Sequence, residues 1–263
     1  MALERFEEAC VHPYIDSLLV SAFPYGSFSS PNVTSDLDYL LITKDTSLHD
    51  CIRSCASSIY NEFHIPVQFN VWEEACLRGG VHTIDLSFQE HLRHSVQKHG
   101  YHGEHPFDII SSNGVSLHDS ICQSVASYHK RMTDRFLESG FSKSYEMRYL
   151  RNSLQNSFHV MRVMVQYFEG SLGDDYEDTT EFVVQRYLEA VDHPDLQRDV
   201  EDIFGAAFYY KDFVSQRNGH LADTPPEDLS HMYESLLSDL MPVASTGRSF
   251  IQKNASIVAQ VRK

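Results

Sequence analysis

Three short stretches near the start of the chain have the hydrophobic pattern of strands. Ser17–Phe23 and Leu37–Thr43 are compact apolar runs. Val67–Trp72 alternates apolar and polar side chains with a period of two, which is typical of a strand with one covered face. These stretches predict a small sheet near the beginning of the chain.

Helical periodicity dominates the rest of the sequence. Residues 2–10 and 46–62 predict helices beside the strands, and residues 84–98 predict the end of a strand running into a helix. A connection rich in Gly, His and Pro follows at 99–115. Further helices are expected near residues 117–139, 144–169, 176–191, 195–216, 227–240 and 245–261. We therefore predict an α+β protein, with a small mixed-sheet domain at residues 1–105 and an all-α helical bundle at 106–263.

The composition is that of a globular protein with a strongly acidic charge balance. Of the 263 residues, 42% are hydrophobic, and 37 acidic against 21 basic side chains give a net charge of −16. A nucleic-acid binder needs a basic stripe that displaces counterions from phosphates, and the sequence shows none. We expect no nucleic-acid partner. The acidic balance favours either solubility alone or a small cationic partner.

The same features predict a cytoplasmic protein with no membrane partner. No apolar run approaches the roughly 18 to 20 residues of a membrane helix, and the acidic start Met1–Glu8 differs from a signal peptide. The five cysteines include no Cys-x-x-Cys pair. Cys51 and Cys55 lie four apart on a predicted helix, where they suit half of a metal site or, as we expect, two reduced thiols.

The clearest chemistry lies between the first two predicted strands. Gly26-Ser27 follows the first strand, where a tight turn lets backbone N–H groups and the Ser27 hydroxyl surround phosphate. Asp36 and Asp38 are two apart, so both carboxylates project from one face of the second strand. Two such carboxylates suit Mg²⁺ held against a triphosphate, and Ser35 would support a phosphate or orient Asp36. The alternative is a turn followed by a strand with two aspartates on its solvent face.

This arrangement resembles the signature of the DNA polymerase β-like nucleotidyltransferase superfamily, Gly-Ser followed by a short loop and Asp-x-Asp. The chain length, the helical second half and the stretch Ile84–Arg93 are similar to the aminoglycoside 3''-adenylyltransferase group. The resemblance implies a nucleotidyltransferase domain and a helical substrate-binding domain, with Mg²⁺ as cofactor and ATP or another NTP as substrate. The implied activity is transfer of AMP to a hydroxyl of a small, cationic, aminoglycoside-like acceptor. Arg186 is then a candidate phosphate contact, or else a surface arginine.

One position departs from the superfamily pattern. Active members carry a third carboxylate on the strand after the helix, and the resemblance places Gln68 there. A neutral amide cannot usefully accept the proton of an attacking hydroxyl or add charge to a metal site. In another register Glu73, Glu74 or Asp85 reaches the site instead. Alternatively, the enzyme works slowly with two acids and a base from the substrate or the helical domain. The other reading is a nucleotide-binding, antitoxin-like or regulatory protein with an inactive site.

Five histidines between His91 and His105 form the other conspicuous group. His91 and His94 are three apart on a predicted helix, a spacing that suits Zn²⁺. No cysteine or carboxylate accompanies them at a fixed spacing. We therefore expect ordinary helix and loop residues rather than a metal site.

Overall fold

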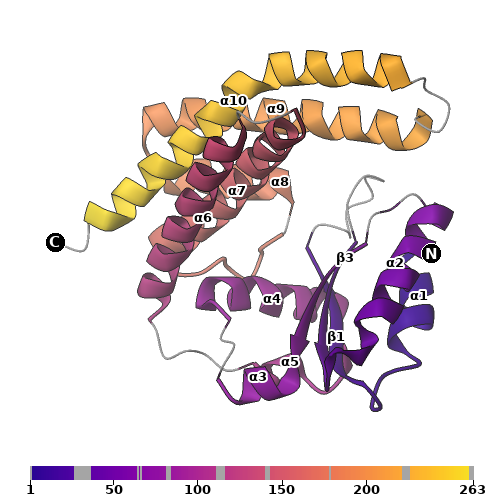
Figure 1. Cartoon of the computed structure of the whole chain (residues 1–263). Helices are drawn as coiled ribbons and strands as arrows, with labels where there is room; N and C mark the ends of the chain where they lie inside the picture. The colour runs from indigo at the N-terminus through magenta and orange to yellow at the C-terminus, as the bar shows by residue number, and fades with distance from the viewer. Residues whose placement is uncertain are drawn as a thin grey trace. The chain divides into compact units, whose positions relative to one another are not determined.

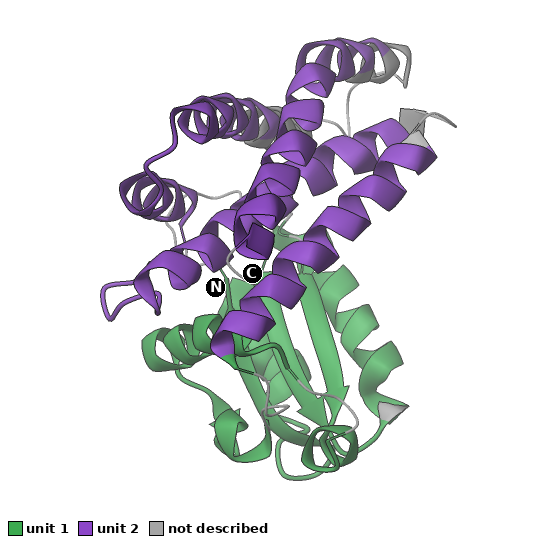
Figure 2. Cartoon of the chain, turned by 90° about the vertical axis from the view of Figure 1, so that its left-hand side faces the viewer, with its two compact units in different colours: residues 1–116 green, residues 117–263 purple. Residues whose placement is uncertain are grey.

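The fold is described from a computed structural model of the chain (Figure 1). The described residues are 2–26, 37–63, 65, 67–80, 84–110, 116–139, 143–177, 179–220 and 226–260. The chain divides into two compact units, Met1–Ser116 (unit 1) and Leu117–Lys263 (unit 2), coloured separately in Figure 2. The division falls at the end of the Gly, His and Pro-rich connection, later than the predicted boundary at residues 105 and 106.

Unit 1 is built on a mixed sheet of four strands, β1 (Leu19–Tyr25), β2 (Leu37–Thr43), β3 (Val67–Glu73) and β4 (His102–Gly103). Their order across the sheet is β3-β2-β1-β4. β2 runs antiparallel to β1 and parallel to β3, while β4 pairs antiparallel with β1. The three strands that the sequence predicts are confirmed, although β1 extends to Tyr25 beside the glycine turn.

The strand sequences reflect how much of each strand is covered. β2 is central, with helices over both faces, so most of its side chains are apolar and buried. β3 lies at the edge of the sheet, where Val67, Phe69 and Val71 pack on the core and Gln68 and Asn70 are exposed. This alternation is the period-two signal in the sequence.

Helices cover both faces of the sheet (Figure 1). The elements on the first face are α1 (Ala2–Phe6), the π-helical turn η1 (Glu7–Val11), and α2 (His49–Phe63), which follows the 3₁₀ turn η3 (Thr46–Leu48). α4 (Leu86–His99) covers the second face. Alternate residues of β2 divide between the faces, with Tyr39 under the first group and Leu40 and Ile42 against α4. Asp38 has the parity of Leu40, so its carboxylate belongs to the α4 face.

The connection after α4 contains two short elements that the sequence does not predict. β4 joins the edge of β1, and α5 (Pro106–Ile109) begins at His105, whose Nδ1 accepts the Phe107 N–H at 3.3 Å. Arg78 at the end of α3 (Glu74–Arg78) holds this segment through a salt bridge to Glu104. Elements of this length leave no periodic signal in a sequence.

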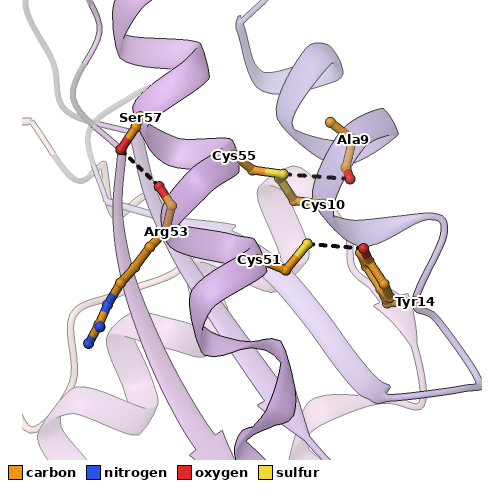
Figure 3. The surroundings of a disulfide bond; sticks show 7 residues. All are labelled: Ala9, Cys10, Tyr14, Cys51, Arg53, Cys55 and Ser57. Carbon is orange, nitrogen blue, oxygen red and sulfur yellow. Dashed lines mark hydrogen bonds between the residues drawn. A yellow bond between two sulfur atoms is a disulfide. The ribbon is translucent and has the colours of Figure 1, made fainter.

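A disulfide joins the N-terminal segment to α2. Cys10 in η1 is bonded to Cys55, 45 residues later, and the two Cα atoms are 6.3 Å apart (Figure 3). The prediction of reduced thiols at Cys51 and Cys55 is therefore wrong for Cys55. Cys51 instead lies 3.0 Å from the Tyr14 hydroxyl (Figure 3). The bonded pair has no signature in sequence spacing, because the fold alone brings η1 onto α2.

The described part of unit 2 is helical and has its own hydrophobic core. Its helices are α6 (Leu117–Ser139), α7 (Lys143–Glu169), α8 (Thr180–Ala190), α9 (Pro194–His220) and α10 (Pro226–Gln260). Each contributes buried apolar side chains to one cluster, including Val125, Leu154, Val184, Ile203 and Ile251. The amphipathic patterns in the second half of the sequence arise from this core.

One long helix replaces two predicted ones at the end of unit 2. The sequence predicts a break near residues 241–244, but α10 continues through Pro242. Proline removes one backbone hydrogen-bond donor, and on both sides of it α10 contributes side chains to the core that it shares with α7. Ser153 Oγ donates to the Ala244 carbonyl at 2.7 Å, and a Cβ added at Gly247 would lie 2.3 Å from the same Oγ. Close helix–helix contact thus preserves α10 across the proline.

The predicted α+β class is confirmed in its coarse form, a small mixed sheet of four strands followed by a mostly helical remainder. Among the helices that the structure describes, none is long and apolar enough to cross a membrane. Fold alone does not determine chemistry, so the functions of the two units must be argued from their side chains.

Candidate functional site

The candidate site lies where β1 ends and β2 begins. Because these strands are antiparallel, Tyr25 at the end of β1 pairs with Asp38 near the start of β2. Gly26 follows with a φ of +86°, a left-handed conformation that favours glycine. A Cβ at Gly26 would lie 2.9 Å from Asp38 Oδ2. Glycine is therefore required both by the backbone conformation and by its approach to the carboxylate.

The structure places part of the predicted Gly-Ser and Asp-x-Asp motif. Gly26 and Asp38 lie beside each other at one end of the sheet, and Asp38 is half-buried. Ser27, Ser35 and Asp36 lie outside the described residues. The roles assigned to these three residues, and the pairing of the two aspartates, stay predictions.

Gln68 is the neighbour of Asp38 on the next strand. The parallel register of β2 and β3 pairs Asp38 with Gln68 directly. Both residues have the parity of the α4 face, and Gln68 is exposed there. The side chain beside the Asp38 carboxylate is thus an amide, which can donate hydrogen bonds but carries no charge.

The three acids considered as replacements for Gln68 are engaged elsewhere. Glu73 pairs with Thr43 at the other end of β3, roughly 16 Å along the strand from Gln68 at about 3.3 Å per residue. Its parity also places it on the opposite face. Glu74 accepts from Arg78 at 2.7 Å, and Asp85 caps α4 by accepting the Ser87 N–H at 2.9 Å. The register therefore keeps Gln68 as the side chain beside Asp38.

An aromatic group from β1 and α4 lies next to this strand end. The Tyr25 ring packs edge-on against Phe88 and His91, with centroids 6.0 and 6.2 Å away. The Tyr25 hydroxyl accepts a hydrogen bond from the Asn70 amide on β3. His91 is 2% exposed and stacks on Phe88. His91 is accordingly a packing residue on the buried side of α4.

The remaining histidines of the His91–His105 group do not form one site. His94 and His99 belong to α4, and His105 caps α5. His102 is different, because its Nε2 lies 3.2 Å from Glu7 Oε1 and its ring packs edge-on against His12. Among the residues that the structure describes, Glu7, His12 and His102 are the one His, Cys, Asp or Glu group of three or more in which one ligand atom from each residue lies within 4.8 Å of the others.

Glu7 and His12 were not candidates in the sequence for a physical reason. They are five residues apart, which in an α-helix puts two side chains on different faces. The chain instead forms a π-turn, in which the His12 N–H donates to the Glu7 carbonyl at 2.8 Å. The wider turn brings residues five apart onto one side. A spacing of five residues, which is the hydrogen-bond spacing of a π-turn, is the sequence signal that could indicate this pair.

Glu7 also accepts a hydrogen bond from a residue of the sheet. The buried Tyr39 hydroxyl on β2 donates to Glu7 Oε1 at 3.0 Å. Burial, and secondarily the nearby Glu7 carboxylate, raise the pKa of Tyr39 far above its ordinary value. The phenol therefore stays protonated and orients the Glu7 carboxylate.

Arg186, the predicted phosphate contact, lies in α8 of unit 2. Its guanidinium forms a salt bridge with Glu169 at the end of α7, and its Nε is buried without a hydrogen-bond partner among the described residues. The salt bridge gives Arg186 a structural role between two helices. Its contact with a phosphate stays a prediction.

Comparison of the chain with family models, with curated proteins and with solved structures gives no match.

Proposed function

We propose that unit 1 is a nucleotidyltransferase domain that transfers a nucleoside monophosphate, AMP from ATP, to a hydroxyl of a small acceptor, with release of pyrophosphate. The observation that carries this proposal is the approach of the Gly26 backbone to the Asp38 carboxylate at one end of the mixed sheet. A glycine turn beside a strand-borne carboxylate lets a polyphosphate approach the backbone while the carboxylate faces a cation. Asp36, two residues from Asp38, would supply the second carboxylate.

The Asp38 carboxylate, together with that of Asp36, would suit Mg²⁺, which prefers carboxylate oxygens and few protein ligands. Asp36 and Asp38 would hold the ion, which would neutralise phosphate charge during attack on the α-phosphorus. The other contributions come from the chain itself. Backbone N–H groups at Gly26 and Ser27, with the Ser35 hydroxyl, would bind phosphate oxygens and fix their position for in-line attack.

Gln68 limits how the proposed reaction can remove the proton of the acceptor hydroxyl. An amide beside Asp38 can donate to a phosphate oxygen but cannot take the proton of the acceptor hydroxyl. We therefore expect slow transfer in which a basic group of the acceptor takes that proton. An amine-bearing acceptor of the aminoglycoside type would suit this role, because an amine in its neutral form can take the proton while its protonated amines match the net charge of −16.

A second candidate function rests on the same amide. The β3 residue paired with Asp38 is the uncharged Gln68, and the contacts of Glu74 and Asp85 lie elsewhere. A domain with this site would bind a nucleotide without transferring it and would act as a regulatory or antitoxin-like protein. Turnover distinguishes the two functions.

The nucleotide site is tested by calorimetry with ATP, with and without Mg²⁺. Bare carboxylates repel a triphosphate, so we expect binding with Mg²⁺ and none in EDTA. Asp38→Asn should abolish binding. Asp50→Asn is the matched control, since its carboxylate is almost fully exposed at the start of α2 and should not affect binding. Equal affinity in EDTA, or unchanged binding by Asp38→Asn, would refute the metal–nucleotide site.

Turnover is tested by transfer of labelled AMP to a panel of amine-bearing polyols. Activity of the unmodified chain that is lost in Asp38→Asn supports the enzyme. Gln68→Glu would add a proton acceptor beside Asp38 and should raise transfer. Mg-dependent binding without transfer in the unmodified chain, together with transfer in Gln68→Glu, would favour the inactive, regulatory function instead.

A further inference from the structure

Three potential metal ligands from two distant segments of unit 1 meet on the first face of the sheet. Glu7 lies in η1, His12 is the first residue after η1, and His102 lies in β4. One ligand atom from each of the three residues lies within 4.8 Å of the other two. The 3.2 Å between Glu7 Oε1 and His102 Nε2 is close to the roughly 3.3 Å expected for two ligands of a tetrahedral ion with bonds of about 2.0 Å.

The backbone around these ligands is held at several points. The π-turn places His12 above Glu7, and single π-turns are frequent at functional sites. The disulfide of Cys10, which lies between the two ligands in sequence, fixes the same segment to α2. His102 is held because β4 pairs with β1 through Ala22 and His102. Little chain movement is needed to close the three groups around an ion.

The Glu7 carboxylate also has the supporting contact that metal ligands usually have. The buried Tyr39 hydroxyl donates to Glu7 Oε1 at 3.0 Å and orients the carboxylate from the buried side. Hydrogen bonds of this kind to a ligating group strengthen metal binding about 10- to 100-fold. An ordinary surface ion pair between His102 and Glu7 would need neither Tyr39 nor His12.

Two imidazoles and one carboxylate define the class of ion. This ligand set suits Zn²⁺ and similar first-row transition metals, whereas Mg²⁺ prefers oxygen ligands alone. Glu7 and His102 keep 16% and 32% of their side-chain surface exposed, and His12 is exposed. Water can therefore reach a fourth coordination position.

We propose that Glu7, His12 and His102 bind one divalent transition-metal ion, Zn²⁺ or a close relative, with a fourth position open to solvent. The ion links the N-terminal segment to the edge strand β4. This site is independent of the proposed nucleotide site, because Tyr39 and Asp38 are consecutive in β2 and face opposite sides of the sheet.

The proposal is tested by titrating the full, oxidised chain with Zn²⁺ in excess Mg²⁺, which occupies sites made of oxygen ligands. We expect one tight equivalent that is lost in both Glu7→Gln and His12→Ala, with affinity at least about 100-fold weaker. Glu7→Gln retains an acceptor for Tyr39, and His12 is exposed, so neither change should unfold unit 1. Glu8→Gln and His193→Ala, which alter exposed side chains, are matched controls and should bind as the unmodified chain does.

Co²⁺ provides the second readout, because its visible spectrum reports direct coordination. The spectrum of the bound ion should show imidazole and carboxylate ligands and should disappear in His12→Ala. Asp38→Asn should keep the Zn²⁺ equivalent, which separates this site from the nucleotide site. No tight equivalent in the unmodified chain, or an equivalent that survives in Glu7→Gln and His12→Ala, would overturn the proposal.

Discussion

Gly26 determines both the backbone turn after β1 and the space available to the Asp38 carboxylate. Its positive φ turns the chain away from β1, and its missing side chain leaves room for the Asp38 carboxylate. Any larger residue would meet both a backbone penalty and a steric one. The position therefore links the geometry of the candidate site to a measurable stability.

Gly26→Ala should separate these two penalties when compared with Gly80→Ala. Gly80 also has a positive φ, but a Cβ there would meet nothing within 4 Å. Gly80→Ala should lower the free energy of unfolding by roughly 1–2 kcal/mol, whereas Gly26→Ala should lower it further and displace Asp38. Urea unfolding and Mg-ATP calorimetry of both variants measure this. Equal losses of stability with intact ATP binding would show that the contact with Asp38 does not matter.

Groups of functional residues were predictable only where their members lie close together in the sequence. Gly26 and Asp38 belong to a strand–turn–strand motif, so the sequence points to them directly. The partnership of Glu7 with His12 depends on a π-turn, and that of either with His102 depends on the pairing of β4. Neither leaves a periodic trace, because both are set by tertiary contacts.

At the scale of elements, the contact between α7 and α10 depends on a small residue. Gly247 brings α10 close to Ser153, whose hydroxyl donates to Ala244, and Ser157 Oγ would be 3.0 Å from an added Cβ. Glycine inside a helix normally costs about 1 kcal/mol relative to alanine. Its presence here is explained by the close approach of the two helices.

Gly247→Ala should therefore destabilise the protein although alanine is the better helix former. Overpacking of a close contact costs typically about 1–3 kcal/mol, which exceeds the propensity gain. Gly205→Ala in α9 is the matched control, because a Cβ there meets nothing and should stabilise the helix by up to about 1 kcal/mol. Thermal unfolding of both variants gives the comparison. A gain in stability for Gly247→Ala would contradict the packing explanation.

A helix or strand was predictable from the sequence when its buried side chains recur at a regular spacing. β2 and β3 follow from an apolar run and an alternation, and α6 agrees with its predicted range. α10 was divided wrongly because local rules penalise Pro242, while the helix on both sides of it packs into the core that it shares with α7. β4 and α5 are too short for any period to be recognised.

At the scale of the whole molecule, three buried tyrosines connect stability with alkaline pH. Burial raises the pKa of Tyr39, Tyr149 and Tyr187 above the ordinary value of 10. The folded state therefore keeps these phenols neutral while the unfolded state ionises them. Their contribution to stability is fully present below about pH 10 and is lost as pH rises beyond it.

We expect the free energy of unfolding to fall above about pH 10 by up to about 1.4 kcal/mol per pH unit for each such tyrosine. Tyr39→Phe and Tyr187→Phe should each reduce this slope, even though Tyr187→Phe also loses the hydrogen bond to Asn254. Urea unfolding across this pH range measures the pH dependence of the free energy of unfolding separately from its absolute value. Slopes unchanged in both variants would refute the linkage.

The disulfide predicts a second global effect. Closing a loop with a sequence separation of 45 is worth about 4 kcal/mol in the chain-entropy estimate. Replacing Cys10 and Cys55 together by serine should lower the urea midpoint, and reductant should do the same to the unmodified chain. Cys76→Ser, which changes a thiol outside the pair, should leave the midpoint in place. Identical midpoints with and without reductant would contradict this prediction.

The same covalent bond determines how the chain would respond to being pulled from its two ends. The closed loop contains β1 and β2 entirely, whereas β3, β4 and unit 2 lie outside it. A stretching force could unravel everything outside the loop while leaving the β1–β2 hairpin unloaded. The oxidised chain would also be about 150 Å shorter at full extension than the reduced one, since each residue spans at most about 3.3–3.6 Å.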